Sequence, residues 1–546
     1  MIKILKKQNG LYYLLILSVV LAGGFFDWSA AFLGTLVFAA GIWRTIRTRR
    51  YIIVRAKWIW LLLLQELCLV VSLCSAVDRG MAFVGVIRFL PVAGWLLLCM
   101  QYSREEREKA LDAIPHAGCM LIAVGLVGYL IPALKDWLWV AQRLGGFFQY
   151  PNTCAMFLLL GLIYLNGKDS RAARIQWCVL FWGILLTGSR IVMILFVGVL
   201  LYLLVREREK KFVRRLIGVN VLAAVAAGVL MVLLTGSYQN LARLATVFSS
   251  NSTFWGRLLY WQDALHMIKD APLGLGYRGY YYLQPVTQSG VYMTLYVHND
   301  LLQSFLDGGW LSGIALGTLF IYQLRFSRHR LMLVVLFLHS LADFDLQFAA
   351  VWFTAVLLFD YGTKQRELTK AGQRIWPVCL KGCLGLLCLY FCIPFAAGYV
   401  GDYETSLRLY PGYTQMKEEL LSYVTDADAA LSLADEILET NPYVSLAYEV
   451  RAQVAYAMGE IEEFSEYKEK VLAIERYSIA AYEDYARCLE EYKTHAAEAG
   501  DMDGVRYCSE KYGQIGRMLE ELERTTSPLA YKLRDQPVFT LTREEM

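Results

Sequence analysis

The sequence predicts an all-α protein, a polytopic bundle of membrane helices followed by a soluble helical domain. Hydrophobic residues make up 57% of the 546 residues and charged residues only 19%, whereas about a quarter of a soluble protein is charged. Apolar runs of about 15–23 residues recur along residues 1–398, and that length is close to what crosses a bilayer. From about residue 414 onward, apolar residues recur every three or four positions among charged ones, which is the period of a helix with one buried face.

About twelve to thirteen apolar segments are predicted to span the membrane. They lie at about residues 10–27, 28–43, 58–76, 81–100, 114–133, 152–166, 174–187, 190–205, 216–235, 302–323, 331–346, 347–361 and 376–398. Lys3, Lys6 and Lys7 precede the first run, and no small-residue cleavage site stands out after it. We therefore expect the first segment to be retained rather than removed as a signal peptide.

The distribution of Lys and Arg over the loops predicts the orientation in the membrane. Loops on one side hold 28 of these residues, and loops on the other side hold about eight. The basic loops are residues 1–9, 44–57, 101–110, 167–174, 206–215, 325–330 and 362–374. Because basic loops stay in the cytoplasm, we expect the N-terminus inside, and the loop at 236–300 and residues 399–546 outside.

The charge balance changes sharply near residue 399 and predicts two domains, 1–398 and 399–546. Residues 399–546 carry 15 basic and 30 acidic residues, a net charge of −15, whereas residues 1–398 carry +19. Nucleic-acid binding needs clusters of Lys and Arg, so the acidity of the second domain argues against a nucleic-acid partner.

A three-residue pattern recurs after 34 residues in the second domain, at Tyr443, Ala447 and Tyr448 and again at Tyr477, Ala481 and Tyr482. This period is typical of tetratricopeptide (TPR) repeats, in which stacked helical hairpins bury faces that one hairpin cannot bury alone. A generic helical bundle is the alternative, and either arrangement suits docking of an envelope protein partner.

The cysteines predict no metal site. Ten of the twelve lie in or beside apolar segments without polar company, which is typical of small buried hydrophobic residues. The other two, Cys488 and Cys508, lie in the second domain, and the sequence leaves open whether they form a disulfide.

The loop at 236–300 is the strongest candidate for an active-site element, because most connections between helices are short. It contains Arg257, Trp261, a Pro/Gly turn at 272–276, His298 and Asn299. Histidine is the side chain best suited to general acid–base chemistry near neutral pH. Asn299 is also a candidate cap for the helix that follows.

Charged residues kept within apolar surroundings give further candidates. Arg88 lies inside the fourth predicted span, where an arginine is costly unless it is paired or hydrated. Arg143 precedes two glycines and the Pro-Asn entrance of the sixth span, where Asn152 or Thr153 is a candidate helix cap and the helix N-terminus suits an anion.

Two more positions complete the set of candidates. Ser189 and Arg190 form the polar interval between the seventh and eighth spans, where an interfacial anchor is the alternative reading. His339 and Asp343 lie four residues apart within a predicted span and therefore on one helical face, either as a structural pair or as a functional one.

The arginines predict a diphosphate ligand, because guanidinium groups bind phosphate oxygens in pairs and stay charged at any relevant pH. No cluster in the sequence resembles a metal site, and no histidines occur at ligand spacing on one helix, so neither a metal nor another cofactor is expected. We assign catalysis to His298, Arg257 and Arg190. The residues expected to bind substrate are Arg88, Arg143, Asn152, Ser189, Trp261, Asn299 and His339.

In their order and spacing these residues resemble the O-antigen ligase/polymerase superfamily of bacterial envelope glycosyltransferases. The resemblance spans roughly residues 140–345. It rests on Gly-x-Phe-x-x-Pro-Asn at 146–152, Gly-Ser-Arg at 188–190, and the loop from Arg257 through the turn at 272–276 to His298-Asn299. The family usually has about twelve spans, so a thirteenth span and an exported helical domain depart from its layout, as in members that glycosylate proteins.

The resemblance implies a GT-C-like fold and transfer of glycan from an undecaprenyl diphosphate carrier to an acceptor hydroxyl, without metal, at the outer face of a bacterial cell membrane. It implies that Arg190 and Arg257 contact the diphosphate and that His298 is the general base. The acceptor is a glycan, a lipid or a protein, and membrane lipids surround the enzyme.

Several functions stay open on the sequence alone. Polymerase and ligase activities are not separated, and a protein O-oligosaccharyltransferase of the same superfamily is the alternative. A polysaccharide or lipid transporter is the alternative from a different class. A transporter predicts symmetry between two halves and broken helices near the bilayer midplane, and the sequence shows no such symmetry.

Overall fold

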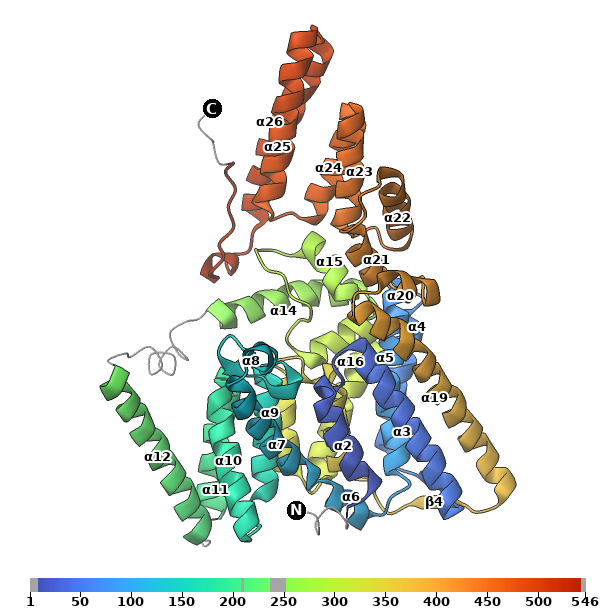
Figure 1. Cartoon of the computed structure of the whole chain (residues 1–546), viewed down its shortest axis with the longest axis vertical. Helices are drawn as coiled ribbons and strands as arrows, with labels where there is room; N and C mark the ends of the chain where they lie inside the picture. The colour runs from blue at the N-terminus through green and yellow to red at the C-terminus, as the bar shows by residue number, and fades with distance from the viewer. Residues whose placement is uncertain (1–7, 208–210, 236–251, 542–546) are drawn as a thin grey trace.

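The computed structural model describes residues 8–207, 211–235 and 252–541. The described residues are 76% helical, with very little sheet, which confirms the predicted all-α class. The helices of the first part stand side by side, and the helices of the C-terminal part stack on one end of them, at the top of Figure 1.

Each predicted span overlaps one helix. In chain order these helices are α2 (Gly10–Val20), α3 (Asp27–Thr48), α4 (Lys57–Ser72), α5 (Arg79–Cys99), α7 (Ala113–Tyr129), α9 (Pro151–Leu165), α10 (Arg171–Thr187), α11 (Arg190–Arg206), α12 (Lys211–Thr235), α16 (Asp300–Phe326), α17 (Arg330–Ser340), α18 (Ala349–Leu358) and α19 (Ala371–Tyr399). By length and composition, 6 of the described helices are long and apolar enough to cross a membrane, and several others are shorter and apolar.

Short elements join these helices. They are η1 (Ala22–Gly24), α6 (Arg104–Ala110), α8 (Pro132–Leu138), η2 (Gly146–Phe148) and η3 (Asp345–Gln347). Strand β1 (Tyr51–Val54) pairs antiparallel with β4 (Gln365–Leu368), with Tyr51 opposite Leu368. Strand β2 (Trp139–Val140) pairs with β3 (Arg143–Leu144).

The helices enclose a common apolar core. Every residue of α18 is buried, and α3 packs against both α5 and α19. The Trp95 ring stacks on Phe353 with ring centroids 4.4 Å apart, an arrangement that adds to the free energy gained by burying the two side chains. Helix α12 stands to one side of α10 and α11, and its apolar side chains are mostly exposed, as expected for a helix that faces lipid (Figure 1).

The long loop predicted at 236–300 contains two helices. Residues 236–251 lie outside the described part of the chain. Helix α14 (Ser252–Asp270) runs across the end of the bundle, below the C-terminal helices, and α15 (Gly279–Thr287) follows the Pro/Gly turn (Figure 1). The described part of this loop, residues 252–300, is therefore a structured layer between the membrane helices and the C-terminal helices (Figure 1).

The Pro/Gly turn at 272–276 fits into a break in α16. Gly309 interrupts that helix with φ 77° and ψ −172°, a conformation that needs glycine. Across the break, the N–H of Leu275 donates to an α16 carbonyl at 2.6 Å, and the N–H of Trp310 donates to the Pro272 carbonyl at 3.0 Å. A Cβ atom on Gly309 would lie 2.3 Å from the Pro272 oxygen, so the close approach also requires the glycine.

The C-terminal part is a succession of helices in which each packs against the next. They are α20 (Tyr403–Leu409), α21 (Thr414–Leu421), α22 (Ala427–Thr440), α23 (Ser445–Met458), α24 (Ile461–Ile474), α25 (Ile479–Ala499), α26 (Met502–Thr525) and the short η4 (Ala530–Lys532). The tetratricopeptide assignment stays a prediction. Cys488 and Cys508 are buried free thiols.

Packing is continuous between the membrane helices and the first C-terminal helices. One apolar cluster contains Met81 of α5 together with Tyr413 and Ile437 of the C-terminal part. The Tyr410 hydroxyl donates to the Gly80 carbonyl at 2.8 Å. The division at residue 399 stays a prediction drawn from composition, and the two parts share one buried interface.

Glu418 of α21 makes this interface sensitive to pH. Burial raises the pKa of Glu418 to about 7, in spite of a hydrogen bond from Tyr282 of α15. Between about pH 4.5 and pH 7 the folded chain then holds a proton that the unfolded chain releases, so stability rises as pH falls through this window. We expect the Tm of purified protein to be higher at about pH 5.5 than at about pH 7.5, and Glu418→Gln to reduce this difference. The control is Glu419→Gln at the exposed neighbour, which should show the same difference in Tm between the two pH values as wild type. If Glu418→Gln also shows the wild-type difference in Tm, the prediction is wrong.

Candidate functional site

A buried carboxylate, Asp343, joins the candidate residues at one end of the bundle. Its side chain is 0% exposed and lies in the turn after α17. His298 Nδ1 and Arg257 Nη2 each lie 3.2 Å from one of its oxygens. The Tyr150 hydroxyl donates to Oδ1 at 2.7 Å, and Asn152 Nδ2 donates to Oδ2 at 2.8 Å. A buried charge is tolerated only when it is paired with an opposite charge and hydrogen-bonded, and Asp343 meets both conditions.

These partners come from separate elements that meet at this end of the bundle. Arg257 lies on α14, His298 precedes α16, and Tyr150 and Asn152 lie at the entrance of α9. The break at Gly309 is part of this arrangement, because it docks the turn after α14 against α16. The sequence predicted His298, Arg257 and Asn152 as site residues, and the structure brings these three together.

His298 is held in an unusual backbone conformation. Its φ is 52°, in the left-handed region, which costs of order 1–3 kcal/mol for a residue with a side chain. Trp261 Nε1 lies within hydrogen-bond distance of the Val297 and His298 carbonyls, at 3.2 and 3.4 Å. The Val297 N–H donates to Gln303 Oε1 at 3.0 Å. Such backbone strain clusters at active sites, and the contacts of Trp261 stabilise the strained conformation of His298. A role of Trp261 in binding substrate stays a prediction.

The contacts of His298 define which of its nitrogen atoms is available for chemistry. Nδ1 faces the Asp343 carboxylate, and among the described residues Nε2 has no hydrogen-bond partner. The side chain is 20% exposed and packs against the Phe344 ring at 5.0 Å. With a proton on Nδ1, donated to Asp343, the lone pair on Nε2 is free to accept a proton from a substrate.

A second arginine, Arg143, joins the Asp343 cluster through Asn152. Arg143 donates from Nη2 to Asn152 Oδ1 and from Nε to the Thr187 carbonyl, both at 2.8 Å. Burial lowers the pKa of Arg143. Arginine stays charged at neutral pH even so. Two arginines therefore reach the cluster, Arg257 by direct contact with Asp343 and Arg143 through Asn152.

Asp343 is the ionised partner in this cluster. The hydrogen bonds that Asp343 accepts from Tyr150 and Asn152, together with the charge of Arg257, favour the ionised form of its carboxyl group. The Tyr150 hydroxyl is protonated, because burial and the Asp343 charge raise its pKa well above the ordinary value. Tyr150 is therefore a hydrogen-bond donor to Asp343 at neutral pH.

A second polar group lies deeper in the bundle. His339 Nδ1 is hydrogen-bonded to Asp345, and the Thr153 hydroxyl donates to the other Asp345 oxygen at 2.7 Å. The interpretation of His339 and Asp343 as a pair on one helical face is wrong, because α17 ends at Ser340 and the turn brings Asp345 to His339 instead. A role of His339 in binding substrate stays a prediction.

The predicted caps at the entrance of α9 are also wrong. The cap position is Tyr150, and no side chain makes a capping hydrogen bond there. Asn152 and Thr153 instead turn toward Asp343 and Asp345, whose charge makes stronger hydrogen bonds than a helix end offers. The side chain of Asn299, in contrast, does cap α16 by accepting from the Leu302 N–H at 3.0 Å, so its further role in binding substrate stays a prediction.

Arg88 and Ser189 are the remaining predicted positions. Arg88 is 3% exposed and donates to Asp27 at 2.9 Å and to the Gln347 carbonyl at 2.8 Å, so its visible partners are protein groups. Ser189 lies at the cap position of α11, and its hydroxyl is buried without a partner among the described residues. Substrate binding by either residue stays a prediction.

Two residues of the site were not assigned a role from the sequence. Asp343 is predicted only as the partner of His339, in a pair that is either structural or functional, and Tyr150 is an unassigned position in the motif at 146–152. The signal for both was weak, because a turn that brings Asp343 next to residues about 190 positions earlier cannot be read from spacing. Among the described residues, no group of three or more His, Cys, Asp and Glu side chains has an arrangement that could hold a metal ion, and metal-independent chemistry stays a prediction.

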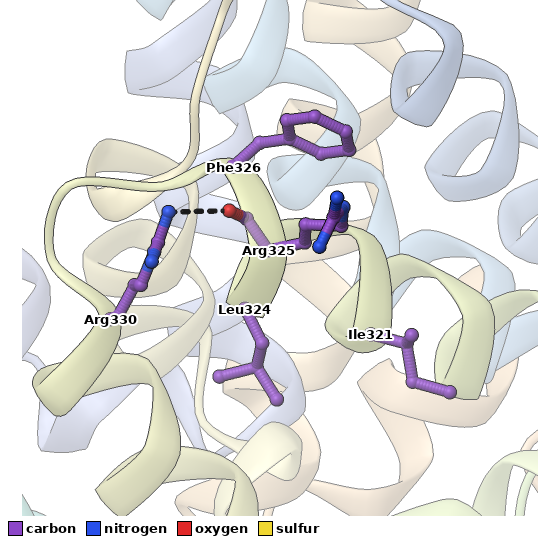
Figure 2. A pocket seen from close by; sticks show the side chains of 5 residues that line it. All are labelled: Ile321, Leu324, Arg325, Phe326 and Arg330. Carbon is purple, nitrogen blue, oxygen red and sulfur yellow. Dashed lines mark hydrogen bonds between the residues drawn. The ribbon is translucent and has the colours of Figure 1, made fainter.

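A hollow surface at the far end of α16 is less suited to catalysis than the Asp343 cluster. It lies where α16 turns into α17 and is lined by Ile321, Leu324, Arg325, Phe326 and Arg330 (Figure 2). Arg330 there donates to the Arg325 carbonyl at 2.7 Å. With a rise of about 1.5 Å per residue, this end of α16 is about 40 Å from Asn299. No histidine or carboxylate occurs in that lining as far as the structure describes it, so the Asp343 cluster is the better candidate.

Comparison with known proteins gives one match. Residues 177–317 match the family model described as O-Antigen ligase. The matched segment contains Arg190, Arg257 and His298, whereas Asp343 lies beyond it. No curated protein and no solved structure matches the chain significantly.

Proposed function

We propose that this chain is a membrane glycosyltransferase that moves a glycan from an undecaprenyl diphosphate carrier to an acceptor hydroxyl at the outer face of the bacterial cell membrane. The observation that carries the proposal is the contact of buried Asp343 with His298 and Arg257. Both of these partners lie inside the segment that is similar to O-antigen ligases. The carrier, the acceptor and independence from metal are parts of the proposal.

In the proposed reaction His298 is the general base. The acceptor O–H bond breaks as its proton passes to His298 Nε2, and the acceptor oxygen forms a bond to the anomeric carbon of the glycan. The bond from that carbon to the diphosphate oxygen breaks, and the electron pair leaves with the diphosphate. Asp343 orients the imidazole and stabilises the imidazolium that forms, as a buried carboxylate does in other Asp–His pairs.

The arginines serve the leaving group in this proposal. A glycosyl diphosphate gains negative charge on its phosphate oxygens as the bond breaks, and fixed positive charge nearby lowers the barrier. Arg257 is 11% exposed and its Nε has no partner among the described residues, so it retains an N–H for a phosphate oxygen. Arg143, which bonds to Asn152, and Arg190, at the start of α11, are the proposed contacts of the second phosphate.

A deletion and complementation experiment tests the proposal. Cells that lack this chain are complemented with wild type, His298→Ala or Arg257→Ala at matched membrane levels. Undecaprenyl-linked glycans are then extracted and sized beside the surface polymer. We expect both variants to accumulate carrier-linked glycan that has not been transferred, because each loses one part of the transfer chemistry. The size of what accumulates separates a polymerase from a ligase, and glycan missing from cell-surface proteins indicates a protein acceptor.

His266 and Lys269 provide controls, because both are exposed on α14 and lie away from Asp343. His266→Ala and Lys269→Ala should restore transfer fully. If His298→Ala and Arg257→Ala also restore it, the proposed catalytic assignment is wrong and the transporter alternative gains support.

A further inference from the structure

Asp27, at the start of α3, links the C-terminal helices to the candidate site. Its side chain is only 10% exposed. The Tyr413 hydroxyl, just before α21, donates to Asp27 Oδ2 at 2.7 Å. Arg88 of α5 donates to Oδ1 at 2.9 Å, and the Tyr277 hydroxyl lies 3.4 Å from the same oxygen. One carboxylate thus holds together a membrane helix, the loop and the C-terminal part.

The first connection from Asp27 reaches the segment that carries Asp343. Arg88 uses its second terminal nitrogen to donate to the Gln347 carbonyl at 2.8 Å. Gln347 ends the short helix η3, which begins at Asp345, two residues after Asp343. Because the carbonyl of Gln347 is fixed by a buried ion pair, the turn that carries Asp343 is fixed as well.

The second connection from Asp27 reaches the segment that carries His298. The Tyr277 hydroxyl lies 3.3 Å from the Tyr296 hydroxyl, and Tyr296 is two residues before His298. The Tyr296 ring packs on Phe344 at 5.1 Å, and Phe344 packs on the His298 ring at 5.0 Å. Asp27 is therefore linked indirectly to both members of the His298–Asp343 pair, to each by a separate chain of contacts.

We propose that Asp27 and Tyr413 are positioning residues, and that docking of the C-terminal helices through the Tyr413 hydroxyl sets the geometry of the His298–Asp343 pair. This inference rests on the proposed glycan transfer for its kinetic consequence. It assigns the C-terminal part a role in turnover in addition to any role in binding partners. It also makes Arg88 a positioning residue, because its hydrogen bonds go to Asp27 and to the turn.

A pair of tyrosines allows the proposal to be tested within one short segment. Tyr410 and Tyr413 both donate a hydroxyl hydrogen bond from the C-terminal part to the membrane part, Tyr410 to the Gly80 carbonyl and Tyr413 to Asp27. Phenylalanine at either position removes one docking hydrogen bond and leaves the ring in place. Only the Tyr413 change removes a bond to Asp27.

The full chain is purified in lipid nanodiscs and assayed with a lipid-linked glycan and an acceptor. Tyr413→Phe should lower kcat about 10-fold, as expected for losing a hydrogen bond to a charged group, with little change in KM. It should also shift the acid limb of the pH profile of kcat/KM, which a change in folding alone does not do. Tyr410→Phe should keep the wild-type kcat and pH profile although it loses a comparable docking bond. Equal kinetic losses in the two variants would overturn the proposal.

A double-mutant cycle tests the route through Asp27. Asp27→Ala removes both acceptor oxygens and should lower kcat further than Tyr413→Phe, because Arg88 also loses its ionic partner. If Tyr413 acts through Asp27, the double variant should be no slower than Asp27→Ala alone. Losses that multiply would show that Tyr413 acts independently of Asp27 and would contradict the proposal.

Hydrogen exchange gives a readout that does not depend on the proposed function. Amides at 344–348 and 296–299 should exchange faster in Tyr413→Phe than in wild type or in Tyr410→Phe. If wild type transfers no glycan in the assay, the proposed function fails, and the exchange result still decides the coupling. If exchange at these amides is the same in all three proteins, the coupling fails even when the transferase assignment holds.

Discussion

Asp343→Asn is expected to lower kcat for glycan transfer by about 10³- to 10⁴-fold, the size of effect seen when the carboxylate of a catalytic Asp–His pair becomes an amide. The amide keeps the size of the side chain but cannot stabilise an imidazolium. Its N–H₂ group also favours the imidazole tautomer with the proton on Nε2, which removes the lone pair that must accept the substrate proton. The measurement is turnover of a lipid-linked donor by purified enzyme, with His298→Ala in parallel.

Asp360→Asn is the matched control for this prediction. Asp360 also lies in a turn beside a membrane helix, and its Oδ2 accepts from the Gly362 N–H at 3.2 Å, so the change keeps the local size and removes one charge. Its activity should equal that of wild type. If Asp343→Asn retains more than about a tenth of wild-type turnover, His298 does not need the Asp343 carboxylate to orient its ring and stabilise its imidazolium, and the proposed role is wrong.

Asp345→Ala is expected to destabilise the fold by about 3–5 kcal/mol, the usual cost of removing one partner from a buried ionic or hydrogen-bonded pair. His339 and Thr153 both bond to Asp345, and the His339 and Asp345 side chains are 0% exposed, so water cannot replace the lost partner. The measurement is the unfolding midpoint of the purified protein in a denaturing-detergent titration, compared with wild type.

The paired variant His339→Leu with Asp345→Leu separates this cause from a general loss of packing. Replacing both members by apolar groups removes the unpaired buried atoms, so the double variant should be more stable than Asp345→Ala. A double variant that is less stable than Asp345→Ala would show that the polar pair itself, and not the isolated partner, governs stability here.

Local patterns in the sequence were enough to predict the helices. Each apolar run became a helix because a chain in lipid must satisfy its own backbone hydrogen bonds, and this rule depends only on nearby residues. The same holds for Asn299, whose capping of α16 follows from the residue type and the helix start.

Patterns that depend on contacts between distant segments were not predictable in this way. Spacing of four residues placed His339 and Asp343 on one helix face, but the helix ends between them and each finds a different partner. Arg88 was recognised as unusual from its apolar surroundings, yet its partner Asp27 lies on another helix and its second acceptor is a backbone carbonyl. The residue types and their apolar surroundings were thus enough to identify the candidate residues. Which of these residues contact one another could be known only from the three-dimensional structure.

The contact between Asp27 and Tyr413 joins positions 386 residues apart, and this separation constrains how the molecule is made. A chain synthesised from its N-terminus inserts α3 and α5 early, so Arg88 can find Asp27 long before translation ends. The hydroxyl of Tyr413 can reach the same carboxylate only after α19 and the segment that follows it have been synthesised. A ribosome-bound or truncated chain that stops before Tyr413 lacks the hydrogen bond that we propose positions the His298–Asp343 pair. Assembly of the proposed catalytic site is therefore delayed until the whole membrane part has been synthesised.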